Sequence, residues 1–190
     1  ARLAYSTVSQ LSYIVLGAVM LTPMAMVGGI IHIAGHALSK ITLFFCAGSI
    51  YCASRRKKIS DLAGIGRKLP WTMAAFFIGS LGMIGVPPSG GFISKWYLVM
   101  GSVDAREMVF LAVLLVSSVL NAAYFLPITY TAFFEKESAG PVGDGPDAIA
   151  PDEIREIPLV TIPLVATAFL SLVMGVFPGY FLNLAGGVVP

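Results

Sequence analysis

The sequence has very little charge. Of its 190 residues, 12% are Asp, Glu, Lys or Arg, whereas about 25% is usual for a soluble domain. It is 57% hydrophobic and has a mean hydropathy of +0.86. A small soluble domain needs charged side chains over its surface, and this chain has too few. The composition therefore excludes the soluble globular class and indicates an integral membrane protein.

Other absences narrow the function. The two cysteines, Cys46 and Cys52, lie six residues apart within one apolar stretch and would face different directions on a helix, so we expect no disulfide. The sequence contains no phosphate-binding loop, no catalytic Ser or Cys constellation and no nucleic-acid-binding signature. It therefore predicts neither an independent enzyme, nor a cofactor, nor a nucleic-acid partner. A signal peptide and an initiator Met are also lacking, and we interpret the chain as the C-terminal part of a longer protein.

Long apolar stretches predict an all-α membrane protein with about five transmembrane helices, since about 20 apolar residues suffice to cross a bilayer. We expect the third crossing to be broken at Pro87-Pro88. Two prolines remove two amide donors, and Gly90 and Gly91 allow backbone conformations that a helix excludes. The piece after the break is too short to span alone. The expected helices are residues 4–21, 27–53, 70–86 with 92–100, 107–134 and 158–184.

The basic residues predict the orientation of the chain. Residues 54–69 carry six Lys or Arg side chains against the single acid Asp61, and short loops rich in Lys and Arg stay on the cytoplasmic side. This loop is therefore expected in the cytoplasm. Residues 135–157 form an acidic loop that should be mobile and falls on the same side. Acids contribute little to orientation, so this loop does not contradict the prediction.

One apolar stretch contains a row of titratable side chains. His32, His36 and Lys40 follow one another at intervals of four residues, which places them on one face of a helix. A charged side chain at the bilayer centre costs about 2.5–3.5 kcal/mol on insertion scales. Histidine changes charge near neutral pH. Because nothing structural requires this cost, the row predicts a proton path.

Alternatives to this path stay open. The two histidines could bind a metal, but no third ligand follows on that face, and we predict no metal site. They could instead be structural histidines hydrogen-bonded between helices, although that leaves Lys40 unexplained. Snorkelling does not suit Lys40, because it lies about a dozen residues from either end of its stretch.

Lys95 is a second charge within a predicted crossing, one turn after the break. Broken helices line ion cavities in transporters, so Lys95 could continue the path. Alternatively, Lys95 and Trp96 could anchor the membrane interface. Polar side chains that could hold water between the charges, each of which could also serve only in packing, are Ser6, Thr7, Ser9, Gln10, Ser39, Ser94, Ser117, Ser118, Asn121, Tyr124 and Tyr130.

Three segments in order resemble a known family: residues 4–11, which read AYSTVSQL; residues 36–50, which begin HALSK; and residues 85–95, which read GVPPSGGFISK. They resemble the antiporter-like subunits. These are the large proton-translocating membrane subunits of respiratory complex I, of Mrp-type sodium/proton antiporters and of membrane-bound hydrogenases. The resemblance covers residues 1–134 well, and the residues after Lys40 and at Lys95 look most like the branch formed by the D subunits of Mrp antiporters.

The resemblance implies a fold of two inverted five-helix repeats, each with one broken helix. Residues 1–134 would be part of the second repeat with four crossings, residues 135–157 a loop, and residues 158–190 an additional transmembrane helix. The family position matching Lys40 lies on a central hydrophilic axis, and the position matching Lys95 gates the outer proton exit. His32 and His36 match the connecting histidines. The first repeat, with its glutamate–lysine pair, is absent.

Two functions follow as hypotheses. The first is translocation of protons, or exchange of sodium for protons, by a subunit of an Mrp-type or complex I-like assembly. Its partners would be membrane lipid and other antiporter-like and small membrane subunits, in the cytoplasmic membrane of a bacterium or archaeon. In that case the chain is at most a translocase subunit of an NADH:quinone oxidoreductase-like enzyme. The second is a non-conducting scaffold that braces neighbouring pumping subunits. The driving force stays open between redox chemistry, hydrogen evolution and a sodium gradient.

Overall fold

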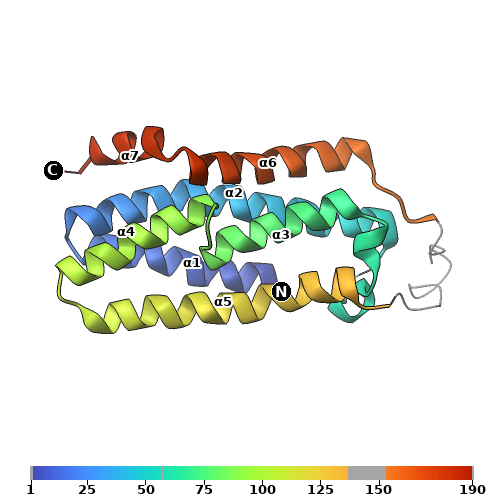
Figure 1. Cartoon of the computed structure of the whole chain (residues 1–190), viewed down its shortest axis with the longest axis horizontal. Helices are drawn as coiled ribbons and strands as arrows, with labels where there is room; N and C mark the ends of the chain where they lie inside the picture. The colour runs from blue at the N-terminus through green and yellow to red at the C-terminus, as the bar shows by residue number, and fades with distance from the viewer. Residues whose placement is uncertain (1, 57, 137–152, 190) are drawn as a thin grey trace.

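The computed structural model describes residues 2–56, 58–136 and 153–189 (Figure 1). Throughout these ranges the regular elements are helices and none is a strand, which confirms the all-α prediction. The elements are α1 (Arg2–Val19), α2 (Pro23–Ser54), the 3-10 turns η1 (Ile59–Leu62) and η2 (Ile65–Arg67), α3 (Pro70–Ile84), α4 (Gly90–Asp104), α5 (Met108–Phe134), α6 (Pro158–Val176) and α7 (Gly179–Gly186). Most of the acidic loop, residues 137–152, lies outside the described residues.

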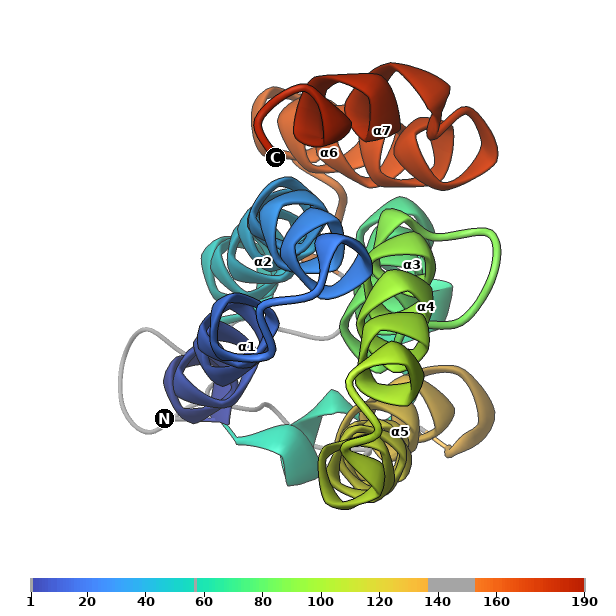
Figure 2. The same ribbon diagram turned by 90° about the vertical axis from the view of Figure 1, so that its left-hand side faces the viewer.

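The long helices run side by side (Figure 1). By length and composition, α2, α5 and α6 can each cross a membrane. Helices α3 and α4 have 15 residues each, so each is about 22 Å long and too short for a hydrocarbon core of about 30 Å. They lie end to end (Figures 1 and 2) and together form one crossing. This arrangement confirms the predicted broken helix.

The break has a local cause. Gly85 ends α3 with a φ of 83°, a left-handed conformation that glycine adopts without strain. Pro87 and Pro88 then prevent the helix from continuing. Helix α4 begins at Gly90, earlier than the predicted residue 92, and continues to Asp104. Gly90 and Gly91 do not have a positive φ, so both join the helix directly after Ser89, which is extended. Gly91 lies against the carbonyl of Gly82, where a side chain would not fit.

The ends of α1 and the end of α3 differ from the prediction by two residues, and two other boundaries differ by more. Helix α2 begins at Pro23 instead of residue 27, because Thr22 caps it by accepting a hydrogen bond from the amide of Ala25 at 3.3 Å and proline suits the first helical position. The last crossing was predicted as continuous to residue 184, but α6 ends at Val176 and α7 follows separately. Pro178 has no amide hydrogen, and its ring would clash with a helical carbonyl four residues earlier.

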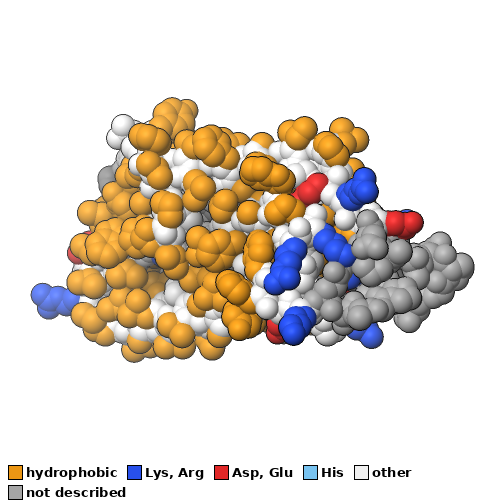
Figure 3. All heavy atoms as spheres, turned by 45° about the vertical axis from the view of Figure 1, so that its right-hand side comes forward, with side chains coloured by type: hydrophobic (Ala, Val, Ile, Leu, Met, Phe, Trp, Pro, Cys, Tyr) orange, Lys and Arg blue, Asp and Glu red, His pale blue; other side chains and the backbone are white. Residues whose placement is uncertain are grey.

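Helix α2 is the centre of the bundle. It contacts α1, α3, α4, α6 and α7, and in the end view α6 and α7 lie on the opposite side of the bundle from α5 (Figure 2). Apolar side chains cover most of the visible surface, whereas most Lys and Arg side chains gather toward one end (Figure 3). A multi-pass membrane protein has this surface, with an apolar band facing lipid and charges beyond it.

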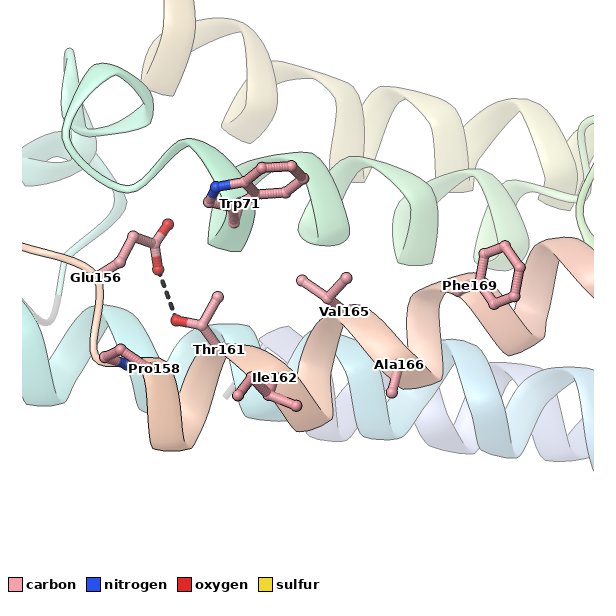
Figure 4. Close-up of a pocket in the computed structure, with 8 residues that line it drawn as sticks. All are labelled: Trp71, Glu156, Pro158, Thr161, Ile162, Val165, Ala166 and Phe169. Carbon is pink, nitrogen blue, oxygen red and sulfur yellow. Dashed lines mark hydrogen bonds between the residues drawn. The ribbon is translucent and has the colours of Figure 1, made fainter.

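One acidic side chain joins α6 to α3. Glu156 accepts hydrogen bonds from the amide of Thr72 at 3.0 Å, from the hydroxyl of Thr72 at 2.7 Å and from the hydroxyl of Thr161 at 2.7 Å. Thr72 lies in the first turn of α3, where backbone amides lack helical partners and a negative charge is favourable. Glu156 lies at one end of an apolar groove of about 610 Å³ along α6, beside Trp71 (Figure 4).

We expect Glu156→Ala to lower the free energy of unfolding by about 1–3 kcal/mol, because it leaves a buried amide and two hydroxyls without their acceptor. Thermal unfolding of the purified protein in detergent would measure this loss. The control is Glu153→Ala, which changes an exposed acid of the same segment. Equal midpoints for the two variants would show that Glu156 does not hold α6 against α3.

Candidate proton path

Helix α2 presents His32, His36 and Lys40 on one face, as their spacing predicts. The rings of His32 and His36 are stacked within 9° of parallel, with their centroids 5.9 Å apart. The exposed fractions of the three side chains are 1%, 9% and 7%. The row is therefore buried inside the bundle and does not face lipid.

Lys40 binds a hydroxyl group of the neighbouring helix. Its ammonium donates a hydrogen bond to Ser6 of α1 and lies 6.0 Å from the centroid of the Phe44 ring. No carboxylate in the described part of the chain pairs with it. A buried charge without a partner of opposite sign is costly, and helix packing does not require one at this position.

Lys95 bridges the break between α3 and α4. Its ammonium donates to the carbonyls of Met83 at 3.1 Å and Ile84 at 2.9 Å, and to the hydroxyl of Ser118 on α5 at 3.2 Å. The two carbonyls belong to the last turn of α3, where they lack helical amide partners. Lys95 is only 6% exposed, which argues against the alternative that it anchors the membrane interface.

Tyr13 lies between the histidine row and Lys95, and the sequence prediction missed it. Its ring meets the ring of His32 edge-on, with the centroids 5.4 Å apart, and the ammonium of Lys95 lies 5.0 Å from its centroid. Its hydroxyl bonds to Ser117 and accepts from Asn121 at 3.5 Å. The spacing of Ser6, Gln10 and Tyr13 at i, i+4 and i+7 could have indicated a shared face on α1.

Most of the predicted lining residues fall into three groups. Of the others, Ser118 accepts from Lys95, Thr7 donates to the carbonyl of Leu3 at 3.0 Å, and Tyr130 is exposed. Gln10, Ser94 and Asn121 lie at the site: Gln10 donates to the Met83 carbonyl at 3.3 Å, and the hydroxyl of Ser94 bonds to Nδ1 of His32 at 2.9 Å. A second group lies on a recess of about 230 Å³ at α1 and α5 and consists of Ser6, Ser9, Ser117 and Tyr124. The lining of this recess also includes Asn121 of the first group, Tyr5 and Leu120.

Ser39 forms the third group, away from the site. Its hydroxyl donates to the carbonyl of Gly35 at 2.9 Å and faces Ser171 of α6 at 3.4 Å. It directly precedes Lys40, and neighbouring residues on a helix point in different directions, so the structure does not place it on the row. The histidine pair has no group of three His, Cys, Asp or Glu side chains around it among the described residues, which gives no support to the metal alternative.

A family profile described as "NADH:quinone oxidoreductase/Mrp antiporter, TM" matches residues 1–121, which include both buried lysines and both histidines. The chain belongs to this family. The family match confirms the resemblance seen in the three sequence segments, and it agrees with an α-helical, multi-pass membrane protein.

Individual antiporter-like relatives support the assignment. The N subunit of the NADH-quinone oxidoreductase of Desulforudis audaxviator is 47% identical over 133 residues, which are 70% of this chain and 26% of that protein. The D subunit of the Na(+)/H(+) antiporter of Alkalihalophilus pseudofirmus is 28% identical over 173 residues, 91% of this chain and 33% of that protein. A chain in the Mrp complex from Dietzia sp. DQ12-45-1b has a TM-score of 0.86 and 25% identity, over 97% of this chain and 41% of that chain.

Two conclusions follow from these comparisons. The fold is that of antiporter-like membrane subunits, and the relatives belong to multi-subunit membrane complexes. The chain spans between 26% and 41% of the length of these three relatives. The nearer likeness to the D subunits of Mrp antiporters stays a prediction, since the 47% identity is to an N subunit of an NADH-quinone oxidoreductase.

Proposed function

We propose that this chain is part of a proton-translocating subunit, and that protons move along Lys40, His36, His32 and Lys95. The observation that carries the proposal is the pair of buried lysines, 7% and 6% exposed, that meet hydroxyl and carbonyl groups instead of carboxylates. Two histidines lie between them on the same helix face as Lys40. Intramembrane ionisable groups of this kind mark ion or proton pathways.

The same proposal covers the place of the chain within its subunit, its orientation in the membrane and its partners. Residues 1–134 form part of an antiporter-like repeat and residues 158–190 an additional crossing. The subunit lies in a bacterial or archaeal cytoplasmic membrane with the basic loop 54–69 in the cytoplasm, where short loops rich in Lys and Arg stay. It contacts membrane lipid and other antiporter-like and small subunits. Exchange of sodium for protons is a second candidate, favoured by the similarity to the D subunit of an Na(+)/H(+) antiporter.

The experiment that tests the proposal is His36→Leu in the full-length protein, assembled with its partner subunits and reconstituted in vesicles with a pH-sensitive dye. Proton movement should fall about tenfold or more, because leucine cannot accept or release a proton. The control is Ile33→Leu, an exposed position on the same helix. Unchanged proton movement in an assembled His36→Leu complex would favour the scaffold alternative.

A further inference from the structure

Helices α1 and α2 run antiparallel, and their contacts determine which residues lie at the same level. Three contacts between the two helices fix this register. A side-chain carbon added at Gly17 would lie 3.0 Å from the Cα atom of Gly29. The ring of Tyr13 meets that of His32, and the ammonium of Lys40 donates to Ser6. Because the helices are antiparallel, a step of four residues toward the C-terminus of α1 matches a step of about four residues toward the N-terminus of α2. The facing pairs are Gly17 with Gly29, Tyr13 with His32, and Ser6 with Lys40.

This register places Gln10 opposite His36. Gln10 lies between Ser6 and Tyr13 along α1, and His36 lies midway between the partners of these two residues on α2. The side chain of Gln10 is fully buried, and that of His36 is 9% exposed. Each has a buried polar atom, Oε1 of Gln10 and Nδ1 of His36, without a hydrogen-bond partner among the described residues.

The orientation of the Gln10 amide follows from its other contact. Its nitrogen Nε2 donates to the carbonyl of Met83 at 3.3 Å, and the reversed amide would place two oxygen acceptors against each other. The oxygen Oε1 is therefore the amide atom that does not face the Met83 carbonyl and has no partner among the described residues. Lys95 donates to the same carbonyl at 3.1 Å, so Gln10 lies beside Lys95 on one side and level with His36 on the other.

The ring of Tyr13 lies between Lys95 and His32. Its ring contacts both Lys95 and His32, and an aromatic ring has no site that relays a proton. Its hydroxyl is engaged with Ser117 and Asn121 on α5. The hydroxyl of Ser94, the residue before Lys95, bonds to Nδ1 of His32 at 2.9 Å and gives the row one link past this ring. A second link can pass beside the ring, at the level of Gln10.

We propose that Oε1 of Gln10 and Nδ1 of His36 hold a bound water between them, which connects the histidine row to the break at Lys95. Water can donate to the amide oxygen and can donate to or accept from the ring nitrogen. The transfer requires a protonated His36 and a neutral Lys95 amine. The water then takes the Nδ1 proton of His36 and gives one of its own protons to the Lys95 nitrogen, which leaves His36 neutral and Lys95 as an ammonium. Gln10 is a positioning residue that exchanges no proton itself. The role in transport rests on the proposed function, whereas the water site does not.

A high-resolution structure of the assembled wild-type protein tests the site itself, and should show a water within hydrogen-bonding distance of both atoms. Two variants test its role. Gln10→Leu fills the space with apolar atoms and should lose both the water and about tenfold in proton translocation. Gln10→Ala leaves room for a second water and should stay within about threefold of wild type. The control is Ser12→Ala, an exposed position on α1.

Several results would overturn the inference. A well-resolved map of the wild-type protein without this water would exclude the site. This result does not depend on whether Gln10→Leu assembles. Equal losses in Gln10→Leu and Gln10→Ala would assign the effect to the lost Met83 contact instead. If Lys40→Met transports normally, the proposed function fails, yet the wild-type map still decides whether the water is bound.

Discussion

Lys40→Met is expected to reduce proton translocation by about a hundredfold or more in a subunit that still assembles. Methionine has a similar length and suits an apolar interior, and it cannot carry a proton. Ser6, which accepts the hydrogen bond of the Lys40 ammonium, also donates to the carbonyl of Leu3 at 3.0 Å. The substitution therefore leaves no buried group unpaired at this contact and removes a buried charge, so stability should be kept or should increase.

Lys40→Arg separates the positive charge of the lysine from its ability to release a proton. Arginine keeps the positive charge but does not release its proton in proteins, so the same large loss is expected if the lysine exchanges protons. Dye-loaded vesicles with the assembled complex measure both variants, and Lys58→Met in the exposed basic loop is the control. Full activity of Lys40→Arg would show that a fixed charge suffices, and this would favour a bracing role.

The sequence predicted the features that arise from local spacing. The four-residue intervals of the histidine row predicted one helix face, and the stacked rings lie there. Pro87 and Pro88 predicted the break, because proline acts on the backbone next to it whatever packs around it. The burial of Lys95 was also consistent with its place one turn after the break.

Contacts between distant helices could not be predicted in the same way. Tyr13 was not distinguished from an ordinary apolar packing residue until its ring was seen between His32 and Lys95. Glu156 belongs to a segment that was interpreted only by its composition, yet it binds Thr72, 84 residues away in sequence. Single-sequence patterns give the direction of a side chain around its own helix, but not the partner on the next helix.

Gly91→Ala should destabilise the protein strongly, by about 3 kcal/mol or more. The added methyl group would overlap the backbone carbonyl of Gly82, on the other half of the broken crossing. A backbone group cannot rotate away as a side chain can, so α3 and α4 would have to separate. The carbonyls of Met83 and Ile84 would then move from the ammonium of Lys95, which they now hold at 3.1 and 2.9 Å.

The matched control is Gly48→Ala on α2, where an added methyl group meets no atom within 4 Å. It should equal or exceed wild type, because alanine favours a helix over glycine by about 1 kcal/mol. Thermal unfolding in detergent and proton translocation in vesicles measure both variants. Wild-type stability of Gly91→Ala would mean that the two half-helices do not touch at Gly82.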